Sequence, residues 1–284
     1  MTTYKTIYNA QVSCPPSSRK NTYEKLKDFE SNFSTMAANL QINGTVDYEI
    51  GYQEETEYFD TLFDVSKVLL TCGLSNDIFK SKNRGPIYFS HSVFPDTKKY
   101  SDFRKAMRAL DAIGYVSYKG HRGNPSNAYI ITGCDITIAD DEVKSRFLSK
   151  DAWYEVYIMG VVRTIMETSF NEVPYELATG VTIRLNNNDI TDCDVLLAVG
   201  NSVFYIETKV SAYKGKEYES YMNKYANHIE LFGFSPVNAC FVCLNKTDEK
   251  LAEMRTYANG RFHVHDNRSF PMWIENRIRE VLKK

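Results

Sequence analysis

The stretch DCDVLLAVGNSVFYIETK, residues 192–209, decides the fold of this chain. Two apolar segments flank a Gly-Asn pair, which is a strong signal for a tight turn between antiparallel strands. Asp194 opens the first segment, and Glu207 and Lys209 lie at the end of the second. Residues two apart in a strand face the same side, so Glu207 and Lys209 are expected to project together while Thr208 points away. The antiparallel pairing is then expected to bring Asp194 to the same point.

Charged side chains at the ends of buried strands indicate a functional site. An unpaired buried charge costs several kcal/mol unless a partner or a metal compensates it. Two carboxylates are hard oxygen ligands that suit Mg²⁺ or Mn²⁺, and a lysine beside them can position or activate a water molecule held by the metal. The stretch therefore predicts a hydrolytic metal site, with phosphodiesters as the favoured substrate class.

The composition indicates a soluble globular protein. Hydrophobic residues make up 43% and charged residues 25% of the 284 residues, a length that accommodates two domains of ordinary size. No apolar stretch approaches the roughly 20 residues of a membrane span, so no membrane partner is expected. The six cysteines are scattered and follow no secretory signal, which favours reduced thiols in a cytoplasmic protein. Cys240 and Cys243 form a C-x-x-C, but their segment is typical of a buried strand and has no zinc-finger spacing nearby.

Charge is distributed unevenly along the chain, although the formal net charge is only −2. Nine acidic residues and two lysines lie between Glu24 and Asp60, whereas ten Lys and Arg residues and three Asp residues lie between Lys80 and Arg122. The basic stretch favours a surface that faces a polyanion. A solvated face balanced by the acidic segment is the equal alternative.

The amino-terminal half has the outline of a winged helix-turn-helix at about residues 60–133. Apolar spacing predicts helices at 61–70 and 100–113, and a two-stranded ribbon is expected at 115–119 and 127–132 around a tip rich in Gly, Asn and Pro. In such modules the second helix enters the major groove and the wing touches the backbone. The residues expected to contact nucleic acid are therefore Arg104, Lys105 and Arg108 on the helix and Arg122 at the wing tip. Winged helices also serve as protein-interaction modules, and that alternative stays open.

The carboxy-terminal half is expected to be an α/β domain with a mixed sheet flanked by helices. Strands are predicted at residues 176–185, 192–199, 202–210, 238–244 and 262–265, and helices at 149–165, 216–231, 249–257 and 271–282. We therefore predict two domains, an amino-terminal α+β winged-helix-like domain over residues 1–138 and the α/β domain over residues 139–284.

The order of acidic residues resembles that of the PD-(D/E)xK nuclease superfamily, in which a helical Glu precedes a strand Asp, a hairpin and a strand Glu-x-Lys. In this sequence the residues are Glu155, Asp194 and Glu207-Thr208-Lys209. The segments at residues 153–155, 192–195 and 205–209 further resemble the nuclease domain of CRISPR-ancillary nucleases activated by cyclic oligoadenylates. Asp192 stands where that family has Glu, and the Pro of the superfamily name is absent. The resemblance covers about residues 149–266, excludes the amino-terminal half and implies a restriction-endonuclease-like sheet.

The resemblance implies a role for each residue of the motif. Asp194 and Glu207 would bind the metal, and the Thr208 carbonyl would complete the ligand set. Lys209 would orient the attacking water and stabilise the charge that develops on phosphorus. Glu155 would act on the water shell of the metal or on a second ion. Asp192 is a candidate for a supporting acid beside the metal ligands. Five residues after the strand could line the path of the substrate, with a solvated helix face as the alternative: Lys214, Lys216, Tyr218, Tyr221 and Lys224. Of these, Lys214 and Lys216 are predicted to bind nucleic acid.

The sequence thus predicts a metal-dependent endonuclease that cuts nucleic acid, with DNA favoured and RNA left open. A homodimer is expected, because one such site cuts one strand and paired sites are needed to break both. A setting in defence, restriction or mobile elements follows by analogy alone. The alternative from another class is a non-catalytic DNA-binding regulator, which would bind through the winged helix and dimerise through its carboxy-terminal half.

Overall fold

A computed structural model describes most of the chain from Val46 onwards, and its contacts form two compact units. The small unit comprises the described residues from 58 to 157, and the large unit combines β1 with the residues from 158 onwards. The sequence predicted two domains that divide after residue 138. The contact-based units do not test that division, which stays a prediction. The described residues are 46–50, 58–74, 76–80, 85–122, 131–173, 175–185, 188–200, 202–210, 217–232 and 234–283.

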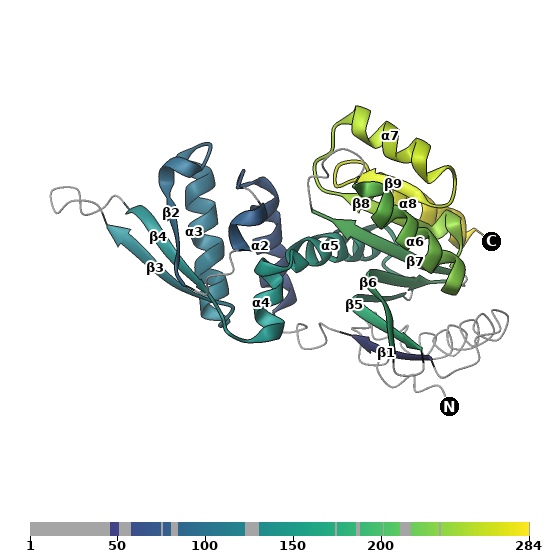
Figure 1. The fold of residues 1–284 in the computed structure, drawn as a ribbon, viewed down its shortest axis with the longest axis horizontal. Coiled ribbons are helices and arrows are strands. Elements are labelled where there is room, and N and C mark those ends of the chain that lie inside the picture. Colours follow the sequence, from purple (N-terminus) through teal and green to yellow (C-terminus); the bar gives the residue numbers. More distant parts are fainter. Residues whose placement is uncertain are drawn as a thin grey trace. The chain divides into compact units, whose positions relative to one another are not determined.

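The large unit is built on a mixed six-stranded sheet (Figure 1), which confirms the expected α/β class with helices beside the sheet. The spatial order is β1 (Val46–Ile50), β5 (Tyr175–Leu185), β6 (Asn188–Val199), β7 (Ser202–Lys209), β8 (Ala239–Cys243) and β9 (His263–Asp266). The pairs from β1 to β7 are antiparallel, whereas β7–β8 and β8–β9 are parallel. Parallel neighbours require crossovers, which α6 (Tyr218–Phe232) and α7 (Asp248–Ala258) supply.

The predicted hairpin joins β6 to β7, with Val199 paired to Ser202. Gly200 has a φ of 59°, in the left-handed region that glycine adopts without steric cost. This turn fixes the register of the two strands and therefore decides which residues meet at their far ends.

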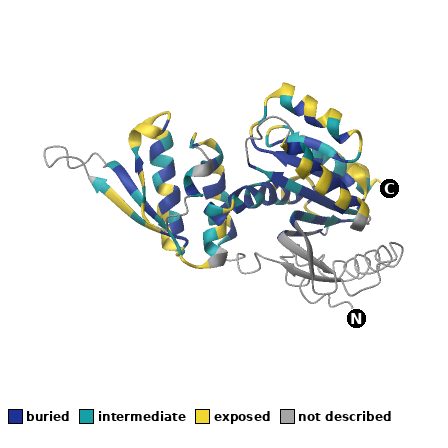
Figure 2. Cartoon of the chain, in the orientation of Figure 1, coloured by how far each residue is buried: buried dark blue, intermediate teal, exposed yellow. Residues whose placement is uncertain are grey.

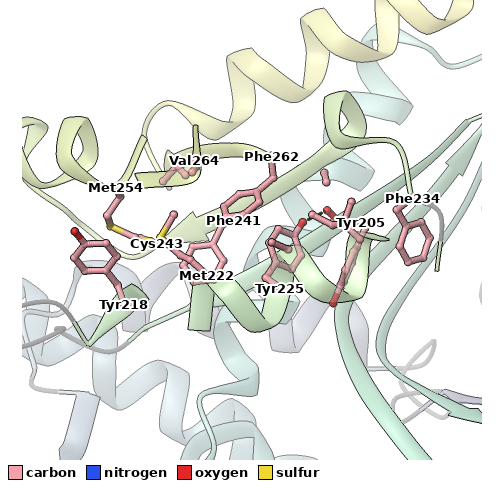
Figure 3. Close-up of a cluster of buried hydrophobic side chains, with 14 of the residues drawn as sticks. Tyr205, Tyr218, Met222, Tyr225, Phe234, Phe241, Cys243, Met254, Phe262 and Val264 are labelled. Carbon is pink, nitrogen blue, oxygen red and sulfur yellow. Dashed lines mark hydrogen bonds between the residues drawn. The ribbon is translucent and has the colours of Figure 1, made fainter. Parts of the chain in front are cut away.

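Helices α6 and α7 cover one face of the sheet through a buried aromatic cluster (Figure 3). Tyr205 of β7 and Phe241 of β8 point into this cluster from the sheet, and Met254 of α7 meets them from the helix side. Within it, the Tyr225 hydroxyl of α6 donates to the backbone carbonyls of Tyr205 and Cys240, at 2.5 and 3.1 Å. These bonds satisfy a buried hydroxyl and hold α6 against β7 and β8.

The opposite face of the sheet packs against α8 (Phe270–Leu282). Its Trp273 ring lies 5.2 Å from the His263 ring and 5.4 Å from the His265 ring, and both histidines alternate with Val264, which faces α7. The carboxy-terminal end of α5 (Ala152–Ser169) is tied to α8 by a hydrogen bond from Ser169 to Glu275.

Strand β8 lies inside the sheet, and all five of its residues are buried (Figure 2). Burial raises the pKa of the Cys243 thiol to about 12, and it raises the pKa of Cys240 well above its usual value. Both thiols are therefore held in the neutral form, as expected of small apolar residues in a core strand.

The described part of the small unit holds a three-stranded antiparallel sheet, three complete helices and the first residues of α5. The sheet order is β2 (Ile87–Ser90), β4 (Ile131–Ile138) and β3 (Val116–Arg122). The helices are α2 (Phe59–Thr71), α3 (Thr97–Ala112) and α4 (Glu142–Ser149), and short 3₁₀ turns lie at Asn76–Phe79 and His91–Val93, with a third at Pro236–Asn238 in the large unit. Helices α2 and α3 and strand β3 stand in the predicted order. The second ribbon strand, predicted at 127–132, lies mostly outside the described residues, and β4 begins at Ile131. Strand β2 and helix α4 were not predicted. The winged-helix assignment stays a prediction.

Helix α3 shows why the sequence folds locally as it does. The Asp96 carboxylate accepts from the Lys99 amide at 2.7 Å and so caps the first turn. Phe103, Met107 and Leu110 form the predicted buried face, and the following Gly114 has a φ of 75°, which stops the helix.

Candidate active site

The strands β6 and β7 stop pairing where the predicted site begins. Their register runs from Val199–Ser202 to Val195–Ile206. Beyond that point, the Thr208 amide donates to Asp194 Oδ2 at 2.6 Å, and the Thr208 hydroxyl donates to the same oxygen at 3.0 Å. The Asp194 carboxylate therefore accepts the hydrogen bond of the Thr208 amide in place of a strand carbonyl, and the two bonds fix the orientation of the carboxylate. Strand alternation predicted that the Thr208 side chain would point away, so this hydroxyl contact is new.

The Lys209 ammonium joins the two carboxylates. Its Nζ lies 2.6 Å from Glu207 Oε1 and 3.9 Å from Asp194 Oδ2. The three side chains are only 14–25% exposed, so solvent screens their charges much less than at an open surface. The structure thus brings together the three residues that the sequence selected, at the end of β7.

The electrostatics of this cluster favour an additional positive charge. Burial, followed by the neighbouring Asp194 carboxylate, raises the pKa of Glu207 from its usual value to about 7, and Lys209 opposes this shift. Two carboxylates share one close ammonium, so the cluster carries a negative excess when both are ionised. A cation bound between the carboxylates would relieve this repulsion.

The donor set fits a hydrated divalent cation. Within the described ranges, no group of three or more His, Cys, Asp or Glu side chains is placed to hold a metal ion. Asp194 and Glu207 offer two carboxylates, and the other ligands of a cation held there would be waters and backbone oxygens. Mg²⁺ is commonly bound in this way, through one or two carboxylates with several retained waters.

Helix α6 lies beside the cluster. The Lys209 Nζ is 5.9 Å from the centroid of the Tyr221 ring, and the charge of Lys224 acts to lower the pKa of Glu207. Tyr218 differs from the expectation that it lines a substrate path. It is buried, and its hydroxyl donates to Glu253 Oε1 at 2.6 Å, because α7 packs over the first turn of α6.

The described contacts do not test four further residues of the predicted site. Glu155 lies on α5, in the part of that helix that belongs to the small unit. Lys214 and Lys216 lie outside the described residues. The backbone of Asp192 pairs with Thr182 of β5, and its side chain lies outside the described part. Their roles stay predictions.

The basic residues of α3 are partly engaged in contacts within the small unit. Arg104 Nε donates to the Tyr118 hydroxyl at 3.0 Å, and the guanidinium of Arg108 lies 5.3 Å from the centroid of the same ring. Lys105 is exposed. Arg122 ends β3, and its side chain is not among those described. Lys105 and Arg108 thus remain accessible to a polyanion, whereas Arg104 is half-buried against Tyr118.

Comparison with known proteins finds similar solved structures and no match by sequence. No protein-family model matches the chain, and no curated protein matches it. Thirteen solved chains match in structure, among them protein VC1899 from Vibrio cholerae, with a TM-score of 0.55 and 14% identity over 87% of this chain and 61% of that one. Another is Can2 from Sulfobacillus thermosulfidooxidans in complex with cyclic tetra-adenylate, with a TM-score of 0.41 and 11% identity over 97% of this chain and 59% of that one.

This chain spans about three fifths of the length of both neighbours. The likeness to VC1899 shows a shared fold and leaves activity to the residues of the site. In the part of the chain that the structure describes, no helix has the length and apolar character needed to cross a membrane.

Proposed function

We propose that the large unit is a metal-dependent nuclease of the PD-(D/E)xK type, which hydrolyses phosphodiester bonds in nucleic acid. The observation that carries this proposal is the meeting of Asp194, Glu207 and Lys209 at the end of β7, with Lys209 Nζ within 3.9 Å of both carboxylates. The mixed sheet that presents them is in keeping with the restriction-endonuclease-like arrangement that the motif implies.

Each residue has a chemical task in this proposal. Asp194 and Glu207 would hold Mg²⁺ or Mn²⁺, together with the Thr208 carbonyl. When bound, such a cation supplies a Lewis acid for the phosphoryl oxygens and lowers the pKa of bound water. The Thr208 amide and hydroxyl fix Asp194. Lys209 would stabilise the negative charge on phosphorus oxygens in the transition state. Glu155 is proposed to act on the water around the site.

The reaction is a hydrolysis. The oxygen of a water molecule forms a bond to phosphorus, and the ester bond between phosphorus and one sugar oxygen breaks. The water gives up a proton, and the leaving sugar oxygen gains one. The small unit is proposed to hold nucleic acid as a winged helix through Lys105 and Arg108. The protein is proposed to act as a homodimer in the cytoplasm, in a defence, restriction or mobile-element setting.

The test is cleavage of supercoiled plasmid, single-stranded DNA and RNA by the wild type, Lys209→Ala and Glu207→Gln, each in Mg²⁺, Mn²⁺ or EDTA. Removal of one charge-stabilising group commonly lowers kcat by about 10²–10³, and we expect a loss of that order for Lys209→Ala. Lys250→Ala is the matched control, because Lys250 forms a 2.8 Å ion pair with Glu253 on α7. This variant should cleave like the wild type.

Cleavage that persists in EDTA, or that survives Glu207→Gln, would contradict the proposal. Linear plasmid appearing together with nicked plasmid would support paired sites in a dimer. DNA binding without any cleavage would favour the alternative of a non-catalytic regulator.

A further inference from the structure

Helix α6 carries two exposed residues beside the proposed active site. Tyr221 is 49% exposed, which is unusual for a large aromatic side chain. Lys224 follows it by three residues on the same helix, so the two side chains are neighbours on one face. The Tyr221 ring lies 5.9 Å from Lys209 Nζ, which connects this face to the end of β7.

The packing of α6 fixes this exposed face. Tyr218, Met222 and Tyr225 are buried in the aromatic cluster (Figure 3). Tyr225 is held by the carbonyls of Tyr205 and Cys240, so α6 cannot rotate without breaking both bonds. Because the buried residues take one side of the helix, Tyr221 is kept outside the core. The ring is therefore held beside the site at little further entropic cost.

Lys224 adds a positive charge on the same side. It is exposed, and its charge acts on Glu207 across the space between α6 and β7. Its charge also acts on His228, one turn further along α6. An aromatic face beside an ammonium is the combination that binds a nucleotide in an unpaired strand, since the ring stacks on the base and the cation contacts the phosphate.

We propose that Tyr221 and Lys224 bind an unpaired nucleic-acid strand next to the carboxylates, with a base stacked on Tyr221 and a phosphate against Lys224. This inference rests on the proposed nuclease function and names its substrate class, a single-stranded or locally unpaired strand. A base within a duplex already stacks on its neighbours on both sides. Only a base that is not stacked inside a double helix of nucleic acid can place its face on the Tyr221 ring.

The test measures binding without cleavage. Affinities for a fluorescent single-stranded oligonucleotide and for the corresponding duplex are compared in EDTA, for the wild type, Tyr221→Ala and Tyr221→Phe. Met272→Ala is the control, because Met272 is 69% exposed on α8, which packs on the sheet face opposite α6. We expect Tyr221→Ala to weaken single-strand binding about 5- to 100-fold, the range that loss of one base–aromatic stack gives. Tyr221→Phe and Met272→Ala should bind like the wild type.

Two additional readouts separate stacking from other roles of Tyr221. Cleavage by Tyr221→Ala should show a raised KM with little change in kcat, whereas a ring that only positions Lys209 would lower kcat. Lys224→Met should reduce the slope of log Kd against log salt by about 1, the change expected when one phosphate contact is lost.

Several outcomes would overturn the inference. They are wild-type protein that does not bind the single strand, Tyr221→Ala that binds it normally, and Tyr221→Ala that loses duplex binding to the same extent. Because binding is measured without metal, these outcomes are independent of whether Lys209→Ala stops cleavage. Failure of the nuclease proposal and failure of the stacking proposal are therefore read from different experiments.

Discussion

Thr208 orients the proposed active site through two hydrogen bonds to one oxygen of Asp194. One comes from the backbone amide, which every substitution except proline retains, and the other comes from the hydroxyl. Both are bonds to a carboxylate, which are stronger than bonds between neutral groups. In the proposed mechanism the Thr208 hydroxyl is therefore a positioning group, and it acts on the reaction through Asp194.

Thr208→Val tests this role, since it removes the hydroxyl and keeps the shape of the side chain. A hydrogen bond to a charged group is worth about 1.5–3 kcal/mol, so we expect kcat to fall about 10- to 100-fold at saturating Mg²⁺. Thr208→Ser retains the hydroxyl and should restore most of the rate. Single-turnover cleavage provides the measurement. An unchanged rate in the Val variant would mean that the backbone amide alone holds Asp194.

The sequence predicted the three charged residues of the site because their placement depends on local rules. The Gly-Asn turn sets the register of β6 and β7, and alternation places Glu207 and Lys209 on one side. The Thr208 contact was missed because it exists only where the two strands stop pairing. The burial of Tyr218 was missed because it depends on α7, which lies 30 or more residues further along the chain.

At the scale of single elements, the end of α2 depends on one glycine. Gly73 follows Thr71–Cys72 with a φ of 78°, a conformation that costs other residues about 1–2 kcal/mol. A methyl group at Gly73 would also lie 2.9 Å from Pro95 Cγ. Gly260, after α7, has a similar φ of 77°, but a methyl group there would meet nothing within 4 Å.

These two glycines form a matched pair for a stability measurement. Gly260→Ala should lower the free energy of unfolding by about 1–2 kcal/mol through its backbone alone. Gly73→Ala should cost more, because Pro95 must also move. Denaturant unfolding of the two variants measures both effects. Equal losses would show that Pro95 yields without cost.

Two short elements of the small unit escaped prediction. Strand β2 has four residues, and the sequence did not indicate it because Pro86, directly before it, argues against a strand. Helix α4 has eight residues, and its last residue, Ser149, was assigned to the start of the helix predicted at 149–165, which begins as α5 only at Ala152. The positive φ of 63° at Asp151 separates the two helices, and Asp151 is a residue type that tolerates it better than most.

At the scale of the whole molecule, the buried His228 and the half-buried His265 link stability to pH. Burial, followed by the charge of Lys224, lowers the pKa of His228 from 6.5 to about 4. Burial also lowers the pKa of His265 to about 4. A lowered histidine pKa means that the folded protein favours the neutral ring. The stabilisation is therefore full above about pH 6.5 and is lost as the pH falls towards 4.

His228→Gln should make the stability of the protein less dependent on pH between 6.5 and 4. The wild type is expected to lose up to about 3 kcal/mol through this one group, and the variant should lack that part of the loss. Unfolding free energies at several pH values give the slope, which does not depend on the absolute stability of the variant. His265→Gln should remove a separate part of the loss of unfolding free energy between pH 6.5 and 4. Parallel curves for the wild type and His228→Gln would contradict this prediction.

The buried cysteines allow the local opening of each compact unit to be measured by the rate of thiol alkylation. All five cysteines in the described part of the chain are buried, with Cys134 in β4 of the small unit and Cys240 in β8 of the large unit. An alkylating reagent can reach such a thiol only during a transient opening of the surrounding structure. The rate at which each cysteine-containing peptide gains mass therefore records how often its own unit opens. One unmodified protein sample, without introduced labels, would report the local stability of both units side by side.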